Sequence, residues 1–259
     1  GYEDEELYHF YFDHLNNKTP YLNILLTLST HEPFLLNQAT FYANKFDKYL
    51  STLALDKSNK EKVSHYKKAL STVLYADESI RNFFRIYQHR TDFEHTIFII
   101  TGDHRMPEIP IEDKLDRYHV PLIIYSPLLK KRKAFRSIST HFDIAPTLIK
   151  LLQKQYSIAM PDTAAWIGLG LDTTIMFRNI HHYPLKQTKS DLVDFISNEY
   201  LENQERLFRI YPNLSIEATR KDSILAETNI RFNQFKLKNN QFSKNLKLLP
   251  DYLYKKYTE

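Results

Sequence analysis

Apolar residues recur with two different periods along the first 155 residues, and these periods predict helices alternating with strands. A spacing of three to four residues predicts helices at residues 4–15, 63–87 and 143–152. Short continuous apolar runs predict buried strands at residues 21–28, 96–101 and 120–125. This succession is typical of an α/β domain with a largely parallel sheet.

The pattern changes after about residue 160. Trp166, the only tryptophan, stands beside Gly168 and Gly170, which predicts a tight turn packed against a buried ring. Further on, residues 192–200 and 204–211 fit either strands or short helices, and residues 216–235 are expected to be helical. We therefore expect a core domain over residues 1–160 and a smaller α+β appendage over residues 161–259.

Composition excludes several functions. The chain has no cysteine, so it has no disulfide, thiolate metal site or cysteine nucleophile. Its 18 tyrosines and 17 phenylalanines argue against disorder. The net charge of +4 is modest and no recognition motif is present, so no nucleic-acid partner is expected. No apolar run could span a bilayer, and the first residue is not Met, which we interpret as an internal start in a longer protein.

The most informative local pattern is the apolar run that ends in Gly102-Asp103-His104. Open α/β sheets bind ligands at the carboxyl ends of their strands. A carboxylate and an imidazole at that edge suit Zn²⁺ or Mn²⁺. An ordinary polar turn after a strand can also contain Gly, Asp and His. The motif alone therefore does not distinguish a metal site from such a turn.

Further segments, in a fixed order, carry a resemblance to a known family. They are Leu28–Phe34, Tyr75–Phe84, Ile99–His104, His119–Pro127 and His141–Leu148. Over about residues 1–155 the chain resembles the second half of the sulfatase family in the alkaline phosphatase superfamily, and within it the lipoteichoic acid synthase (phosphoglycerol transferase) branch. The resemblance implies an alkaline-phosphatase-like three-layer α/β/α fold with a mostly parallel sheet, of which this chain holds the C-terminal half.

The resemblance also implies a site. Asp103 and His104 match the metal ligands of the family, and His31 matches a histidine that faces the charged group of the substrate, as hydrogen-bond donor or general acid. His119 is similar in placement to a histidine of a second metal site. The implied cofactor is a divalent metal ion, Mn, Zn or Ca. Arg105 could bind a sulfate or phosphate oxygen or be a solvated turn residue.

Because His31, Asp103 and His104 each follow an apolar run, we expect them to converge at one edge of the sheet. The nucleophile of the family, a Thr, Ser or modified Cys, lies well upstream of the position of His31. Only about thirty residues precede His31 here, so this chain departs from the pattern and holds half of the expected site.

These observations predict a fragment of a metal-dependent phosphotransferase or phosphoric or sulfuric ester hydrolase that acts on envelope lipid or glycan esters through a covalent intermediate. The fragment by itself is expected to be inactive. An arylsulfatase-type hydrolase and a non-catalytic glycan- or envelope-binding fragment remain alternatives. The branch implies an extracytoplasmic (periplasmic or cell-surface) domain, held at the cytoplasmic membrane by N-terminal helices that this chain lacks.

Other polar groups have plainer interpretations. Asp77, on an apolar stripe, is expected to be a buried carboxylate, and Glu32 a rim carboxylate. His141 is expected to be structural. His181 and His182 would point to opposite faces of a strand and so would not share a cation. The tail from Lys236 to Lys256 fits a solvated helix with a packed aromatic face better than a lipid or glycan contact.

Overall fold

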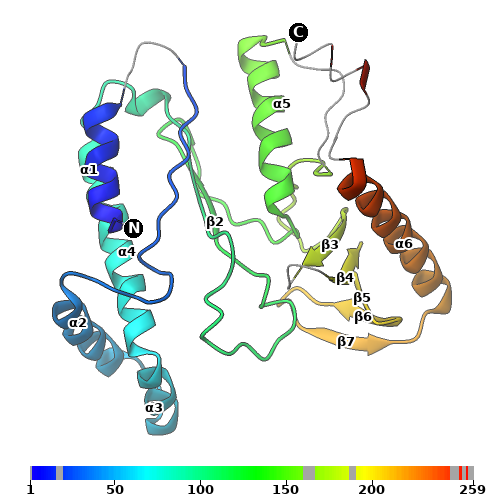
Figure 1. Cartoon of the computed structure of the whole chain (residues 1–259), viewed down its shortest axis with the longest axis horizontal. Coiled ribbons are helices and arrows are strands. Elements are labelled where there is room, and N and C mark those ends of the chain that lie inside the picture. The colour runs from blue at the N-terminus through cyan, green and yellow to red at the C-terminus, as the bar shows by residue number, and fades with distance from the viewer. Residues whose placement is uncertain are drawn as a thin grey trace. The chain divides into compact units, whose positions relative to one another are not determined.

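The computed structural model describes residues 2–15, 20–159, 167–186, 191–245, and residues 251, 252 and 255 (Figure 1). The chain forms two compact units. Unit 1 contains residues 1–110 and 120–131, and unit 2 contains residues 111–119 and 132–259. Both units bury apolar side chains of their own.

Unit 1 is mainly helical. Its elements are α1 (Asp4–His14), α2 (Ala39–Thr52), α3 (Lys57–His65), α4 (Lys67–Tyr87), the 3₁₀ turn η1 (Phe93–His95), β1 (Phe98–Thr101) and β2 (Leu122–Tyr125). Helices α1 and α2 both pack against α4 (Figure 1). The helix predicted at residues 4–15 is confirmed, whereas the one predicted at residues 63–87 consists of α3 and α4, joined at Tyr66.

Aromatic rings join the helices of unit 1 to its strands. The ring of Phe83 on α4 lies 4.9 Å from Tyr8 and 5.1 Å from Phe12, both on α1. It also lies 6.3 Å from Phe98 on β1, which in turn lies 6.0 Å from Tyr125 on β2. Ring pairs at such separations attract one another beyond the effect of the area they bury. These ring contacts therefore hold β1 in place relative to α1.

The mostly parallel sheet predicted from the sequence does not form in the described residues. β1 and β2 are adjacent and antiparallel along their whole length, and the sheet of unit 2 is antiparallel as well. A parallel pair needs a crossover connection, usually a helix. The connection at residues 102–121 holds no helix, and Pro107 and Pro110 disfavour one there.

The apolar run at residues 21–28 is not a strand either. It is extended, but it pairs with no strand in the part of the chain that is described. Its even-numbered side chains point into solvent and are the most exposed, with Leu22 at 76%, Ile24 at 85% and Leu26 at 67%. The period is that of a strand, but no partner strand is present to complete the hydrogen bonds.

Unit 2 is built on an antiparallel meander. Its strands are consecutive neighbours: β3 (His182–Lys186), β4 (Leu192–Ser197), β5 (Tyr200–Asn203), β6 (Arg206–Ile210) and β7 (Ile216–Thr219). Ile196, Leu201 and Ile210 form a core with Leu115. Residues 192–200 and 204–211, which fitted strands or short helices, thus contain β4, the start of β5, and β6. The helix predicted over residues 216–235 is wrong at its start, because β7 occupies residues 216–219 and α6 begins at Asp222.

Helix α6 (Asp222–Asn245) packs against β3, β4 and β5 (Figure 1). Phe232 of this helix is buried and stacks on Phe195 of β4, with ring centroids 5.0 Å apart. Phe195 and Ile196 are consecutive on one strand and so face opposite sides of the sheet. One side therefore packs against α6 and the other carries the core with Leu115.

Helix α5 (Ile144–Tyr156) follows the 3₁₀ turn η2 (His141–Asp143) and belongs to unit 2, although the sequence assigned it to the first domain. Asp143 is fully buried and accepts hydrogen bonds from the backbone of Leu169 and Gly170 and from the hydroxyl of Tyr183. A Cβ at Gly168 would lie 1.8 Å from the carbonyl oxygen of Phe142. Gly168 thus allows a close backbone contact, whereas Gly170 adopts a φ of 102° that side chains disfavour. Trp166 and the predicted boundary near residue 160 lie outside the described residues.

An ion pair in unit 2 between a buried carboxylate and a half-exposed guanidinium gives a test of stability. The guanidinium of Arg178 donates to Asp172 at 2.6 and 2.9 Å, and these bonds hold the pKa of the Asp172 carboxyl well below its usual range. Asp172→Asn should lower the free energy of unfolding at pH 7 by up to about 1 kcal/mol, because solvent screens the half-exposed guanidinium. The folded-state pKa is depressed, so this stability is present above the unfolded pKa of about 3.9 and is lost as pH falls below it.

Urea unfolding of both proteins between pH 7 and pH 3 measures the effect. The difference between wild type and variant should be constant down to about pH 5 and should narrow below pH 4. A difference that is independent of pH over the whole range would contradict the assignment of this pair.

Candidate functional site

His31 lies in a tight loop that follows the extended segment. Its backbone N–H donates to the carbonyl of Leu28 at 3.0 Å, and the N–H of Phe34 donates to the carbonyl of His31 at 2.9 Å. Phe34 is buried with φ of 55°, a conformation that bulky residues rarely adopt and that packing must maintain. The loop therefore holds the exposed His31 ring at a fixed place.

Asp103 and His104 follow β1, as the sequence predicts. A carboxylate oxygen of Asp103 accepts the backbone N–H of His104 at 2.9 Å, and the other lies 3.8 Å from His104 Nε2. Both side chains are exposed, at 73% and 52%. Gly102 has an ordinary φ and room for a Cβ, so the turn does not depend on glycine.

The two histidines meet. The ring centroids of His31 and His104 are 6.1 Å apart, in an edge-on arrangement. The predicted convergence is therefore confirmed for the loop and the strand end, although these segments are about seventy residues apart in the sequence. Since β1 and β2 are antiparallel, the two histidines do not meet at the edge of a parallel sheet.

Both imidazoles have the same hydrogen-bonding pattern. Nδ1 of His31 lies 2.9 Å from the carbonyl of Glu32, and Nδ1 of His104 lies 2.6 Å from the carbonyl of Arg105. A carbonyl oxygen can only accept, so each Nδ1 carries the proton and the neutral ring presents Nε2 as an acceptor. Metal-binding histidines commonly have this arrangement.

A complete set of metal ligands is not assembled. Among the described residues no group of three or more His, Asp or Glu side chains could hold a metal ion. The Asp103 and His104 donors are nevertheless close to the separation of about 3.3 Å expected for two ligands of one tetrahedral Zn²⁺. This pair therefore fits half of a metal site.

Arg105 holds its own loop. Its Nη1 donates to the carbonyls of Met106, Pro107 and Ile109 at 3.0, 3.3 and 3.0 Å. These bonds favour the interpretation of Arg105 as a turn residue, and its binding of a substrate oxygen stays a prediction. His119 belongs to unit 2, where its Nδ1 lies 3.9 Å from Asp116, and its place in a second metal site also stays a prediction.

Asp77 was predicted to be buried, which is wrong. Its side chain is 72% exposed and pairs with Arg81 at 3.2 Å, one turn further along α4. Glu32 is exposed, as expected for a rim residue. His181 and His182 do not share a partner: His181 Nδ1 lies 3.1 Å from the Tyr183 hydroxyl, and His182 Nδ1 lies 2.9 Å from Ser197.

Asp4 is the residue that the sequence interpretation missed. Its buried carboxylate accepts the backbone N–H groups of Leu28 and Ser29 at 3.2 and 3.0 Å, and its own N–H donates to the Ser29 hydroxyl at 3.1 Å. The neighbouring Glu3 accepts the backbone N–H of Asn37. The first turn of α1 therefore binds the His31 loop at both of its ends.

The Asp4 carboxylate also belongs to the packed base of α1. Burial, together with the nearby charge of Asp4, raises the pKa of Tyr8 to about 12. A cluster of acids at a helix start is normally explained by its interaction with the helix dipole, so the sequence interpretation did not assign Asp4 to a loop contact. The one available sign was Ser29, a polar residue directly after an apolar run.

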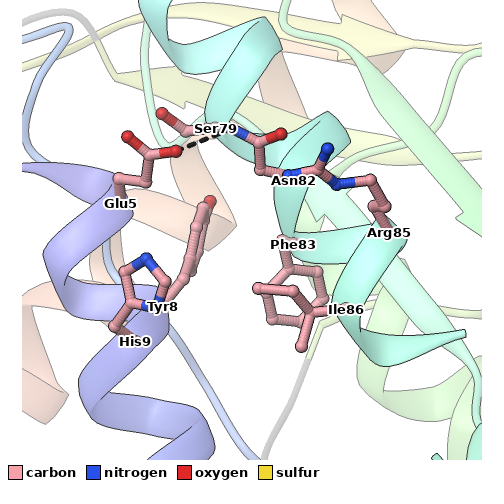
Figure 2. Close-up of a pocket in the computed structure, with 8 residues that line it drawn as sticks. All are labelled: Glu5, Tyr8, His9, Ser79, Asn82, Phe83, Arg85 and Ile86. Carbon is pink, nitrogen blue, oxygen red and sulfur yellow. Dashed lines mark hydrogen bonds between the residues drawn. The ribbon is translucent and has the colours of Figure 1, made fainter. Parts of the chain in front are cut away.

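Unit 1 has a small pocket between two of its helices. Figure 2 shows it between α1 and α4, lined by side chains that include Glu5, His9 and Arg85, with a volume of about 60 Å³. Glu5 accepts a hydrogen bond from Asn82 across it at 2.6 Å. This volume suits a water or two rather than an ester substrate. None of the predicted site residues lines it.

Comparison with protein families decides the class. The Sulfatase family model matches residues 1–154, which is more than half of the chain. The chain belongs to the sulfatase family. No curated protein and no solved structure matches it.

The sulfatase match ends within α5, so it covers unit 1 and the first part of unit 2. It includes His31, Asp103 and His104, whose meeting is thus a feature of the sulfatase part of the chain. The meander and α6 lie beyond the match.

The contact of Asp4 with the His31 loop gives a second test. Asp4→Ala removes an acceptor shared by two backbone N–H groups, one buried and one part-buried, and should lower the free energy of unfolding by about 2 kcal/mol. Hydrogen exchange at Leu28 and Ser29 should quicken. Asp4→Asn should have a smaller effect, because it retains an acceptor oxygen but loses the charge.

Asp13→Ala, an exposed substitution on the same helix, is the matched control and should change stability by less than about 0.5 kcal/mol. Unchanged exchange at Leu28 and Ser29 in Asp4→Ala would show that the loop is held by other contacts.

Proposed function

We propose that this chain contributes the metal-binding half of the active site of a phosphoglycerol-transferase-like enzyme that cleaves lipid- or glycan-linked phosphate esters through a covalent intermediate. Membership in the sulfatase family indicates hydrolase or transferase chemistry on an ester. The observation that supports the site is the meeting of His31 with His104, beside Asp103. In this arrangement His31 would transfer a proton to an ester oxygen. The carboxylate–imidazole pair would hold a metal ion that stabilises negative charge on the same group.

Asp103 and His104 are the proposed metal ligands. The carboxylate oxygen and the free Nε2 of His104 are 3.8 Å apart on adjacent residues, and the Arg105 carbonyl fixes the ring. An imidazole ligand favours Zn²⁺ or Mn²⁺ over Ca²⁺, which prefers oxygen ligands. A bound metal ion would stabilise negative charge on the transferred group.

His31 is proposed to bind and protonate an ester oxygen. Nδ1 of His31 donates a hydrogen bond to the Glu32 carbonyl, so Nε2 is the nitrogen of the neutral ring that can accept a proton. The resulting imidazolium would hold an Nε2–H toward an oxygen of the substrate and could release that proton to it. The contact of the loop with α1 would limit the positions that the ring can adopt.

The nucleophile is proposed to lie outside this chain, upstream of residue 1, together with the remaining metal ligands. The exposed and unpaired segment at residues 21–28 supports this proposal, because its period-two apolar pattern fits a strand with a neighbour. We further propose an extracytoplasmic domain held at the membrane. No helix among the described residues is both long and apolar enough to cross a bilayer.

Metal binding tests the proposed ligands directly. Titration of the chain with Mn²⁺ or Zn²⁺, followed by calorimetry, should show one weak site that Asp103→Ala and His104→Ala each weaken by about tenfold or more. His65→Ala, an exposed histidine on α3, is the control and should leave binding unchanged. Equal affinity in all four proteins would contradict the assignment of Asp103 and His104.

Turnover tests the proposed division of the site. The isolated chain should not hydrolyse aryl phosphates or aryl sulfates above a metal-only blank, because loss of a covalent nucleophile costs several orders of magnitude. A longer protein that includes the upstream sequence should turn over one of these esters. Activity of the isolated chain that Asp103→Ala abolishes would show that the nucleophile lies within residues 1–259.

A further inference from the structure

Residues 128–136 form an exposed stretch that the proposed ester chemistry does not use. All nine residues are solvent-exposed, and they read Leu-Leu-Lys-Lys-Arg-Lys-Ala-Phe-Arg. Five carry positive charge and none carries negative charge. Leu128, Leu129 and Phe135 are 59%, 55% and 47% exposed. We call this stretch the basic loop.

The ends of the basic loop are anchored. Before it, Ser126 is buried, and its carbonyl accepts the N–H of Leu129 at 3.0 Å. After it, the Ser137 hydroxyl donates to the carbonyl of Thr174 at 2.9 Å. The loop is one continuous stretch, so its charge and apolar content do not depend on how the two units are placed.

The charges of the loop are not neutralised by neighbouring acids. In the described part of the chain, no carboxylate forms an ion pair with any of the five cations. The cations are Lys130, Lys131, Arg132, Lys133 and Arg136. Five like charges within seven residues repel one another and attract a surface of opposite charge.

We propose that the basic loop binds the surface of an anionic phospholipid bilayer. Its cations would pair with lipid phosphates, and Leu128, Leu129 and Phe135 would enter the boundary between headgroups and acyl chains. Clusters of four to eight basic residues bind anionic membrane surfaces, and each residue strengthens binding by about fivefold. Apolar side chains beside such a cluster add affinity by leaving water.

The apolar side chains separate a membrane from a soluble polyanion. A polyanion in water needs only the cations, and three large exposed apolar side chains within the same nine residues would give it nothing. At a bilayer both kinds of side chain find a partner. The mixed composition of the loop therefore favours a lipid surface.

Vesicle sedimentation tests this proposal at about 0.15 M ionic strength. The chain should bind vesicles that contain about 30% phosphatidylglycerol and should not bind vesicles of phosphatidylcholine alone. Replacing Lys130, Lys131 and Lys133 by Gln should weaken binding by about 100-fold, from three charges at about fivefold each. The control replaces Lys57, Lys60 and Lys62 of the α3 region by Gln and should change binding by less than about threefold.

A second variant, Leu128→Ser with Leu129→Ser and Phe135→Ser, keeps all five charges and should bind anionic vesicles at least about tenfold more weakly. Equal binding to both kinds of vesicle would overturn the proposal, as would unchanged binding of the Lys130/Lys131/Lys133 variant. If the Ser variant binds like wild type and soluble polyphosphate competes fully, the loop binds polyanions and the membrane proposal is wrong.

Discussion

The buried carboxylate of Asp4 is the constraint on which the candidate site depends. It accepts two backbone N–H groups from the segment that leads into the His31 loop, and it lies at the first turn of α1. A loop without regular secondary structure has few ways to satisfy its buried N–H groups. A charged acceptor at a helix start, where the dipole also favours it, provides one. The aromatic cluster around Phe83 then relates this helix to β1, and so to His104.

The candidate site is open to solvent. Asp103 and His104 are largely exposed, and among the described residues no third ligand joins them. Each histidine is nevertheless oriented by a backbone carbonyl within its own turn. Local hydrogen bonds of this kind form without the rest of a site. The ring orientations of His31 and His104 are therefore set within their own turns and do not depend on a bound ligand.

Some helices and the nearness of His31 to His104 could be predicted from the sequence, whereas α2 and the pairing of strands could not. Helix α1 and the meeting of His31 with the strand end follow from periodicity and from the family motifs. An apolar run predicts an extended segment, but it says nothing of which neighbour is present or in which direction it runs. That is why β1 and β2 were expected in a parallel sheet, and why residues 21–28 were expected to be a strand.

Side-chain partners were harder to predict than elements. Asp77 lies on an apolar stripe, yet a salt bridge one turn away keeps it in solvent. Arg105 follows the metal-ligand pair, but three carbonyls of its own loop take one end of its guanidinium. Both outcomes depend on short-range geometry that residue type and spacing do not specify. Asp4 was missed for the opposite reason, because its partner is 24 residues away.

The exposed row of Leu22, Ile24 and Leu26 has a consequence for handling the protein. An extended, unpaired backbone with large apolar side chains at every second position is a template for self-association through strand pairing. This short segment is therefore an aggregation hazard of the chain. A charged residue at Ile24 would act as a gatekeeper against stacking of copies, because it would place like charges next to one another in every such pair.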